Sequence, residues 1–327
     1  MTKPRTTRPR TTRPLITRPR AATAALALAL SLAVTLTLTA CGSGSGRERS
    51  SADDGHGSPL AHIHGVGESG GKLYVATHDG LYTPDADGRP VRVGERRDDF
   101  MGFTVAPDGR FLASGHPAPG SGGPADLGLV ESTDGGVSWT TRSLAGEVDF
   151  HALDTSADGT VLGYDATNAK LRVSRDGVRW EERATLKALD VAVAPTPART
   201  GARAGSRTDS PAGAATVLAT TDRGVVRSTD GGRNFGRPLS PQVIAYVDWA
   251  APDALFGVDP DGVLLRGADG GARWTRVGVL PGGAPQALTV LDGRRILAAT
   301  RDGVYASADG GRTFTLRMAT GGAPAAS

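Results

Sequence analysis

Short apolar runs rich in β-branched residues recur along most of the chain. Four examples are "KLYVAT", "FLASGH", "TVLATT" and "RILAAT", and turns rich in Gly and Asp separate such runs. Short strands at regular spacing, with turn signals between them, are typical of all-β folds. The pattern therefore predicts an all-β domain over residues 60–319.

One turn sequence repeats among these strands. It reads "STDGGVSW" at 132, "SRDGVRW" at 174, "STDGGRNF" at 228, "GADGGARW" at 267 and "SADGGRTF" at 307. The intervals between its Asp residues are 42, 54, 39 and 40 residues. A period near 40 is typical of a four-stranded propeller blade. Asp-Gly-Gly also supplies the left-handed backbone of a hairpin turn, so each copy is expected to close a hairpin.

The turn resembles the Asp box, or BNR repeat, of sialidases and related propellers. The resemblance covers residues 60–319 and implies that each box joins the third and fourth strands of a blade, away from the binding face. The aromatic after each turn is expected to wedge between neighbouring sheets. The proposed structural residues are Asp134, Trp139, Asp176, Trp180, Asp230, Phe235, Asp269, Trp274, Asp309 and Phe314.

The strands and turns group into six blades of four antiparallel strands, with a seven-bladed propeller as the alternative. The expected blades span 60–96, 97–145, 146–184, 185–240, 241–280 and 281–319. The fourth is long because of an insertion near 195–215, rich in Pro, Gly, Arg and Ser, that cannot bury a core. Because the first blade begins with a first strand and the sixth ends with a fourth, closure by sheet packing is expected.

The amino terminus resembles a bacterial lipoprotein signal. Residues 1–20 hold seven basic residues and no acid, residues 21–38 are apolar, and "LTAC" ends at Cys41, the only cysteine. This predicts a signal peptide over 1–40, lipid attachment at Cys41, a flexible tether over 41–59 and a disordered tail over 320–327. The alternative is a membrane-spanning helix. The lipoprotein interpretation places the propeller on the extracytoplasmic face of the cell membrane.

Charge excludes one class of partner. The chain carries 37 basic and 34 acidic residues, and the signal removes seven of the basic ones, which leaves a net charge of about −4. No basic patch with interleaved aromatics is visible, so nucleic acid is not expected as a partner. We expect a monomer that contacts the membrane through its lipid.

Function is sought where the repeats differ. With the blades aligned on their second strands, one position of the innermost strand changes from blade to blade and holds His64, Met101, His151, Asp190, Tyr246 and Gln286. A second position, in the loop between the second and third strands, holds His78, His116, Ala166, Asp222, Pro260 and Arg301. Both are expected on one rim of the propeller. That rim would gather five of the six histidines, and the sixth, His56, falls in the tether.

The histidines suggest a metal site. His62 and His64 are two apart, as are Asp149 and His151, so each pair shares one face of its strand. A carboxylate at that spacing can orient a ligating imidazole. Thioether with imidazole favours copper, while imidazoles alone also accept zinc or nickel. The proposed ligands are His62, His64, Met101, His116 and His151. The alternative is that each histidine only caps a loop, and the "THDG" around His78 favours a turn.

The sialidase resemblance also raises a glycosidase, but the family's catalytic set is not matched. Sialidases use three arginines and a tyrosine activated by a glutamate, whereas this rim offers Arg301 and Arg223, and no Glu accompanies Tyr246. Glycoside hydrolysis by a pair of carboxylates remains an alternative mechanism. The catalytic candidates are Asp99, Asp149, Asp190 and Tyr246.

The sequence thus predicts a membrane-anchored extracytoplasmic propeller that binds a ligand on a His-rich central face. The candidate ligands are a metal ion such as copper or zinc, a small molecule and a glycan. The alternatives are a sialidase-like glycoside hydrolase and a propeller that binds other proteins as an assembly factor. An Asp-box resemblance indicates the fold and does not decide among these functions.

Overall fold

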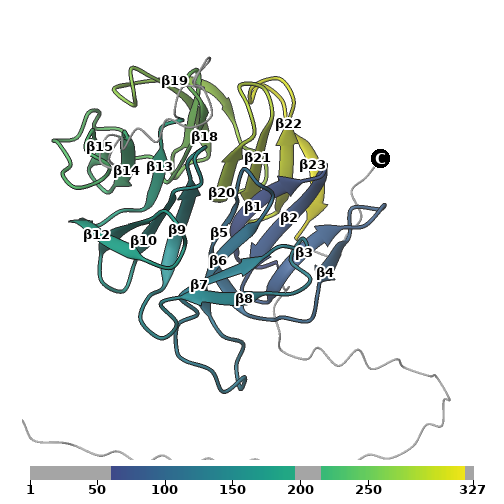
Figure 1. Cartoon of the computed structure of the whole chain (residues 1–327). Helices are drawn as coiled ribbons and strands as arrows, with labels where there is room; N and C mark the ends of the chain where they lie inside the picture. Colours follow the sequence, from purple (N-terminus) through teal and green to yellow (C-terminus); the bar gives the residue numbers. More distant parts are fainter. Residues whose placement is uncertain (1–59, 196–214, 321–327) are drawn as a thin grey trace, which may run out of the picture. The chain divides into compact units, whose positions relative to one another are not determined.

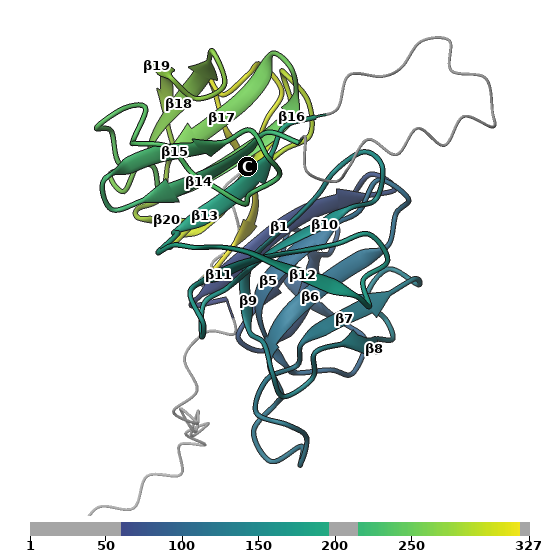
Figure 2. The same ribbon diagram turned by 60° about the vertical axis from the view of Figure 1, so that its left-hand side comes forward.

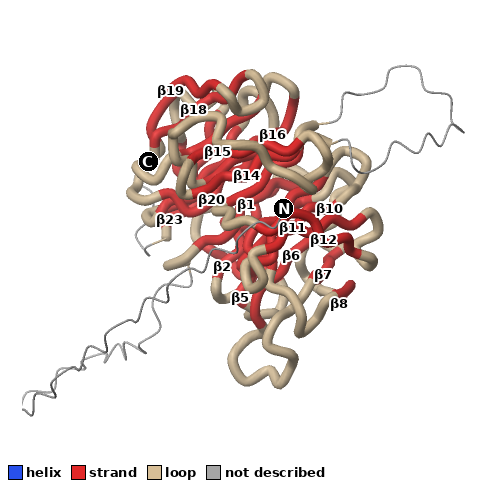
Figure 3. The backbone as a smooth tube through the Cα atoms, turned by 90° about the vertical axis from the view of Figure 1, so that its left-hand side faces the viewer, coloured by secondary structure: helices blue, strands red, loops and turns tan. Residues whose placement is uncertain are grey.

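The computed structural model describes residues 60–195 and 215–320. All regular structure in these two ranges is β-strand (Figure 3). Neither range contains a helix long and apolar enough to span a bilayer. The proposed signal peptide, Cys41 and the tether lie outside the described residues, so the lipoprotein assignment stays a prediction.

The first three blades are four-stranded antiparallel sheets of consecutive strands. The first holds β1 (Ile63–Ser69), β2 (Lys72–Thr77), β3 (Gly80–Pro84) and β4 (Pro90–Val93). The second holds β5 (Asp99–Val105), β6 (Phe111–His116), β7 (Leu129–Ser132) and β8 (Thr140–Ser143). The third holds β9 (Phe150–Thr155), β10 (Val161–Asp165), β11 (Lys170–Ser174) and β12 (Trp180–Thr185). Figure 2 shows β5 to β8 side by side in this order.

The remaining three blades are also antiparallel sheets of consecutive strands, but the fourth has three strands instead of four. The fourth holds β13 (Asp190–Val193), β14 (Val217–Thr221) and β15 (Gly224–Ser228). The fifth holds β16 (Tyr246–Ala251), β17 (Ala254–Val258), β18 (Val263–Ala268) and β19 (Arg273–Val279). The sixth holds β20 (Pro285–Val290), β21 (Ile296–Thr300), β22 (Gly303–Ser307) and β23 (Thr315–Ala319).

The prediction of a six-bladed propeller is confirmed. The fourth blade keeps only a trace of its outermost strand, an isolated bridge between Val225 and Ser240. The innermost strands β1, β5, β9, β13, β16 and β20 each contact the next around the ring (Figure 1). Because β1 and β20 also contact each other and belong to separate sheets, the ring closes by packing, without a strand borrowed across the ends.

The core is divided among the interfaces between blades. Six hydrophobic clusters are found in the described residues, and each joins side chains of two neighbouring blades. The cluster that closes the ring contains Ile63 and Val75 from the first blade and Leu297 and Val304 from the sixth. Apolar area removed from water between blades therefore replaces the strand pairing that a closed barrel would use.

The repeated turn joins third and fourth strands and is held by its own side chains. Ser132 Oγ donates to Asp134 Oδ1 over 2.8 Å and accepts the N–H of Gly136 over 2.8 Å, while Asp134 Oδ1 accepts the N–H of Ser138. Gly136 has φ of 89°, which favours glycine. The same Ser–Asp and Gly–Ser hydrogen bonds recur at Ser228 and Ser307.

The aromatic residue after each turn packs at a blade interface, as expected. Trp139 packs against Phe100 with ring centroids 4.9 Å apart and the ring planes tilted by 38°, in the cluster shared by the first and second blades. Trp180 packs against Phe150 in the same tilted way, with centroids 4.8 Å apart, in the cluster shared by the second and third blades. These rings are half-buried.

Trp139→Ala is expected to lower the free energy of unfolding by about 2 kcal/mol, below the roughly 3–5 kcal/mol typical of a fully buried aromatic. The smaller value follows from the partial exposure of the ring. Denaturant unfolding measures it, with Val137→Ala as control, since Val137 lies in the same turn and is 59% exposed. An unchanged midpoint for Trp139→Ala would show that the ring does not hold the interface.

Candidate functional site

The antiparallel order of each blade decides which loops share a face. A first strand begins where the second ends and the third begins, whereas the Ser-Asp-Gly turns lie at the opposite end of the third strand. His64 near the start of β1, His78 after β2 and His116 at the end of β6 therefore lie on one face. The predicted rim is thus formed by elements of the first three blades.

A β-bulge explains why one position of the innermost strand varies. The ladder between β1 and β2 passes from Ile63 to Gly65, so His64 has no direct partner. The same shift occurs at three other innermost strands, where it leaves Met101, His151 and Gln286 without a direct partner. A bulge bends the strand and re-aims the extra side chain. It therefore frees this position from sheet packing.

Two imidazoles of the first blade and a carboxylate of the second converge. His64 Nε2 lies 3.3 Å from each ring nitrogen of His78, and His78 Nδ1 lies 2.7 Å from Asp99 Oδ1. His64 Nε2 is 3.8 Å from the same carboxylate oxygen. One ligand atom from each of the three lies within 4.8 Å of the others. His62 packs against His78, with ring centroids 4.9 Å apart.

One distance in this group matches that between two nitrogen ligands of a single metal ion, while the 2.7 Å between His78 Nδ1 and Asp99 Oδ1 is a hydrogen-bond distance. Imidazole nitrogens bind zinc at about 2.0–2.1 Å, so two such ligands on a tetrahedral ion lie roughly 3.3 Å apart. The separation of His64 and His78 is 3.3 Å. Burial, followed by the charge of His78, lowers the pKa of His64 to about 4. The ring of His64 is therefore neutral at pH 7, which is the form that ligates metals.

A second group lies on the neighbouring blades. His151 Nε2 is 2.6 Å from Asp149 Oδ2, and His116 Nε2 is 3.4 Å from the same oxygen. The hydrogen bond to Asp149 raises the pKa of His151. The five predicted histidines of the rim are thus divided between two groups. Met101 is half-buried, two residues after Asp99 on β5.

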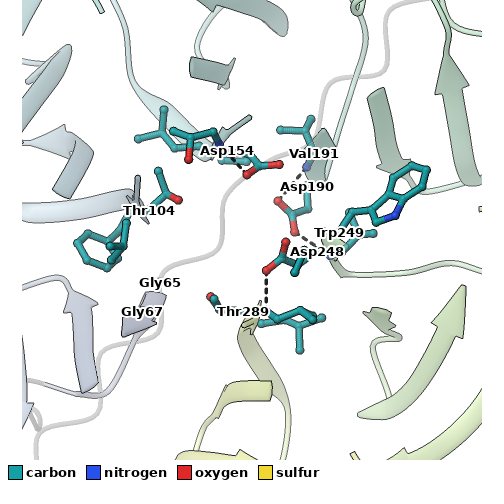
Figure 4. Close-up of a pocket in the computed structure, with 18 of the residues that line it drawn as sticks. Gly65, Gly67, Thr104, Asp154, Asp190, Val191, Asp248, Trp249 and Thr289 are labelled. Atoms are coloured by element: carbon teal, nitrogen blue, oxygen red, sulfur yellow. Dashed lines mark hydrogen bonds between the residues drawn. The ribbon is translucent and has the colours of Figure 1, made fainter. Parts of the chain in front are cut away.

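The centre of the ring is an acidic channel. It encloses a cavity of 420 Å³ whose lining includes His64 and His151 and no Lys or Arg among the described residues. Figure 4 shows the carboxylates of Asp154, Asp190 and Asp248 facing this space. They come from the innermost strands of three consecutive blades.

Each of these carboxylates links its blade to the next. Asp154 Oδ2 accepts the N–H of Val193 over 2.7 Å, and Asp190 Oδ2 accepts that of Val247 over 2.8 Å. Asp248 Oδ2 accepts the N–H of Val290 over 2.6 Å. The carboxylates therefore satisfy backbone donors of innermost strands, which have no strand pairing on their channel side.

Burial raises the pKa of all three channel acids. The pKa of Asp154 rises to about 6, that of Asp190 to about 7 and that of Asp248 to about 8. For Asp190 and Asp248, the charge of Asp154 adds to the effect of burial. At neutral pH the channel therefore holds part of its carboxylates as neutral acids.

The catalytic candidates do not assemble into a sialidase-like set. Burial and the charge of Asp190 raise the pKa of Tyr246 to about 12, the opposite of an activated tyrosine nucleophile. Asp99 and Asp149 contact histidines, and Asp190 bridges two blades. Arg301 and Arg223, the two candidate arginines, are 72% and 86% exposed and pair with their neighbours Asp302 and Asp222.

Sequence reasoning missed some residues of the His64 group and some residues of the acidic channel. It treated His78 as a turn residue and Asp99 as a catalytic candidate, whereas the structure brings both to His64. It also missed Asp154 and Asp248. The available signal was a single acid within each apolar innermost strand, "FHALDT" and "YVDWAA".

Comparisons with known proteins agree with the fold. No protein-family model and no curated protein matches the sequence. Among solved structures, a GH74 enzyme of Niastella koreensis is 16% identical with a TM-score of 0.51, over 80% of this chain and 46% of the enzyme.

Two further structures are shorter propellers. A streptogramin B lyase is 13% identical with a TM-score of 0.51, over 76% of this chain and 80% of the lyase. The WD40 β-propeller domain of Doa1 is 11% identical with a TM-score of 0.50, over 78% of this chain and 81% of that domain. At these identities the likeness shows the fold alone, and the neighbours include both enzymes and an interaction domain. The chain is therefore a six-bladed β-propeller with a His-rich face at one end of its channel.

Proposed function

We propose that the chain is a lipid-anchored extracytoplasmic propeller that binds a divalent transition-metal ion on its His-rich face. The ligands are His64, His78 and Asp99, with His62 beside them. The observation that supports the proposal is the convergence of two imidazole nitrogens, 3.3 Å apart, on one carboxylate oxygen. Two nitrogens and one oxygen suit zinc and copper(II).

Rigid elements support this site. His64 lies at the bulge of β1, Asp99 begins β5, and His78 follows β2 directly. Exposed fractions of 18%, 43% and 25% for the side chains of His64, His78 and Asp99 leave the group open on one side. Three protein ligands with an open position leave room for water or an exogenous ligand on the ion.

His78→Ala is expected to weaken zinc and copper(II) binding at this site by at least about 100-fold, since loss of an outer-shell partner alone costs 10–100-fold. Titration of the metal-free, full-length chain at pH 7 by calorimetry measures the effect. His78 is 43% exposed, so its replacement removes little packing.

The matched control is Asp222→Asn. Asp222 occupies the same loop position in the fourth blade and is exposed, so its replacement should leave affinity unchanged. The proposal would be contradicted if the parent protein showed no saturable zinc or copper(II) binding with a Kd below about 10 μM. Chelator-insensitive turnover of a glycoside, retained in His78→Ala, would favour the enzyme alternative.

A further inference from the structure

We propose that the chain binds a phosphate group with two negative charges between its fifth and sixth blades. The site is a cavity of 320 Å³ whose lining includes Arg266, Arg294 and Arg312. It lies at the end of the propeller that carries the repeated turns, opposite the His-rich face. Its residues and its ligand differ from those of the metal site, so the inference does not depend on the proposed function.

Backbone carbonyl groups hold two of the three arginine side chains. Arg266, on β18, donates from its Nη2 to the carbonyl oxygen of Asp253 over 2.7 Å. Arg312, in the repeated turn of the sixth blade, donates from its Nη1 to the carbonyl oxygen of Asp309 over 2.8 Å. Arg294 lies in the turn between β20 and β21, where its own carbonyl oxygen accepts an N–H of that repeated turn. The three residues are therefore positioned by contacts within the protein.

The positive charge of these arginines is poorly compensated. Arg294 and Arg312 form no ion pair with another described residue, and Arg266 lies 4.0 Å from Asp253, whose side chain is 82% exposed. Asp309 also lines the cavity, but its carboxylate accepts hydrogen bonds from inside the repeated turn. Three guanidinium groups and one carboxylate give the cavity lining a net charge of +2. That charge matches a dianion.

The neighbouring interface, between the fourth and fifth blades, shows a different use of the equivalent arginine. Arg227 has the position of Arg266, since each pairs with the aligned residue of the second strand in its blade. Arg227 Nη1 donates to the carbonyl oxygens of Asp269 and Gly270, in the repeated turn of the next blade, over 2.9 and 3.3 Å. Arg266 bonds instead to Asp253 of its own blade. The space beside the turn of the sixth blade is therefore left open.

Guanidinium groups suit a phosphate ligand. Each presents five N–H donors in a planar fork, which can bind two phosphate oxygens at once through charge-assisted hydrogen bonds. Arg266 and Arg312 each use a donor for a backbone carbonyl, and the side chain of Arg294 has no partner among the described residues. Because the net charge of the lining is +2, a dianion is favoured over the singly charged diester of a phospholipid.

Calorimetric titration of the full-length chain with inorganic phosphate, at pH 7.5 and low salt, tests the inference. The protein is first freed of metal with a chelator and dialysed, so that phosphate cannot bind to an ion on the His-rich face. The parent should bind one phosphate with a Kd below about 1 mM. Arg294→Gln and Arg312→Gln should each weaken binding about tenfold or more, since each removes charge-assisted hydrogen bonds. Both side chains are exposed, so these changes should leave the fold intact.

Arg233→Gln is the matched control. Arg233 has the position of Arg312 in the fourth blade and makes the same bond to a turn carbonyl, but its Nη2 lies 3.2 Å from Glu181 Oε2. The variant changes the net charge of the chain by the same amount and should bind phosphate as the parent does.

Three results would overturn the inference. The first is a parent protein without saturable phosphate binding. The second is an equal loss of affinity in Arg233→Gln, Arg294→Gln and Arg312→Gln, which would show a general effect of charge. The third is binding of dibutanoyl phosphatidylglycerol, a soluble diester, as tight as that of phosphate, which would assign the cavity to a lipid headgroup. None of these results bears on zinc binding at His78.

Discussion

Asp248→Asn is expected to match the parent's stability at pH 5 and to exceed it by about 2–4 kcal/mol at pH 8. Burial raises the pKa of Asp248 to about 8 in the folded chain. An acid whose pKa is higher in the folded state than in the unfolded state, where it is about 4, adds to the stability of the fold at low pH. That added stability is fully present below the unfolded pKa and is lost as the pH rises through the folded pKa. The parent should therefore lose stability across this window, and the variant should not.

The physical cause is the crowding of like charges. Asp154, Asp190 and Asp248 share a channel whose described lining has no Lys or Arg. Asparagine keeps an oxygen that can accept the N–H of Val290, so the bridge to the sixth blade remains while the charge is removed. Water in the channel reduces the effect below the value for a fully dry site.

Denaturant unfolding from pH 5 to pH 8, with a chelator present, measures the difference. Asp222→Asn removes an exposed carboxylate and should leave the pH profile of the parent. If Asp248→Asn were less stable than the parent at pH 8, the carboxylate would be needed in its charged form as a bridge, and the account of the channel would be wrong.

Gly115→Ala is expected to destabilise the chain by roughly 4 kcal/mol or more, which places it among the most severe single substitutions. Gly115 has φ of 142°, and an added Cβ would lie 1.9 Å from the carbonyl oxygen of Asp99 and 2.7 Å from the amide nitrogen of Met101. The clash would part β5 and β6 at the bulge that positions Asp99. Any Gly115→Ala protein that still folds should therefore also bind zinc more weakly than the parent.

Gly109→Ala is the matched control. Gly109 also has a positive φ, of 85°, but an added Cβ would meet nothing within 4 Å. It should cost only the roughly 1–2 kcal/mol of the left-handed conformation. Equal unfolding midpoints for the two variants would show that close packing at the bulge has little importance.

The repeated turns made the fold predictable. Asp134, Asp176, Asp269 and Asp309 each lie between the third and fourth strands of a blade, and the period between them gave the blade count. The aromatics that follow lie at blade interfaces, as expected. The fourth blade departs from the plan, since a single bridge at Ser240 on the outer edge of β15 stands where the other blades have a fourth strand. Thr320, assigned to the tail, donates from its Oγ1 to the carbonyl oxygen of Arg301.

The candidate site was predictable only in part. Aligning the repeats found the variable position because bulges recur at equivalent places, and register confirms Asp190 as the counterpart of Tyr246. Alignment could not divide the histidines into two groups. That division depends on where the loop after β2 places His78 and where the end of β6 places His116, which strand patterning does not encode. The blade-to-blade bonds of Asp154 and Asp248 are likewise contacts between distant segments.

Anomalous scattering from crystals of the zinc-loaded chain, measured on both sides of the zinc edge, tests the central claim most directly. The proposed function predicts a peak about 2 Å from a ring nitrogen of His64, a ring nitrogen of His78 and an oxygen of Asp99. A peak confined to other residues, or no peak at saturating zinc, would contradict it.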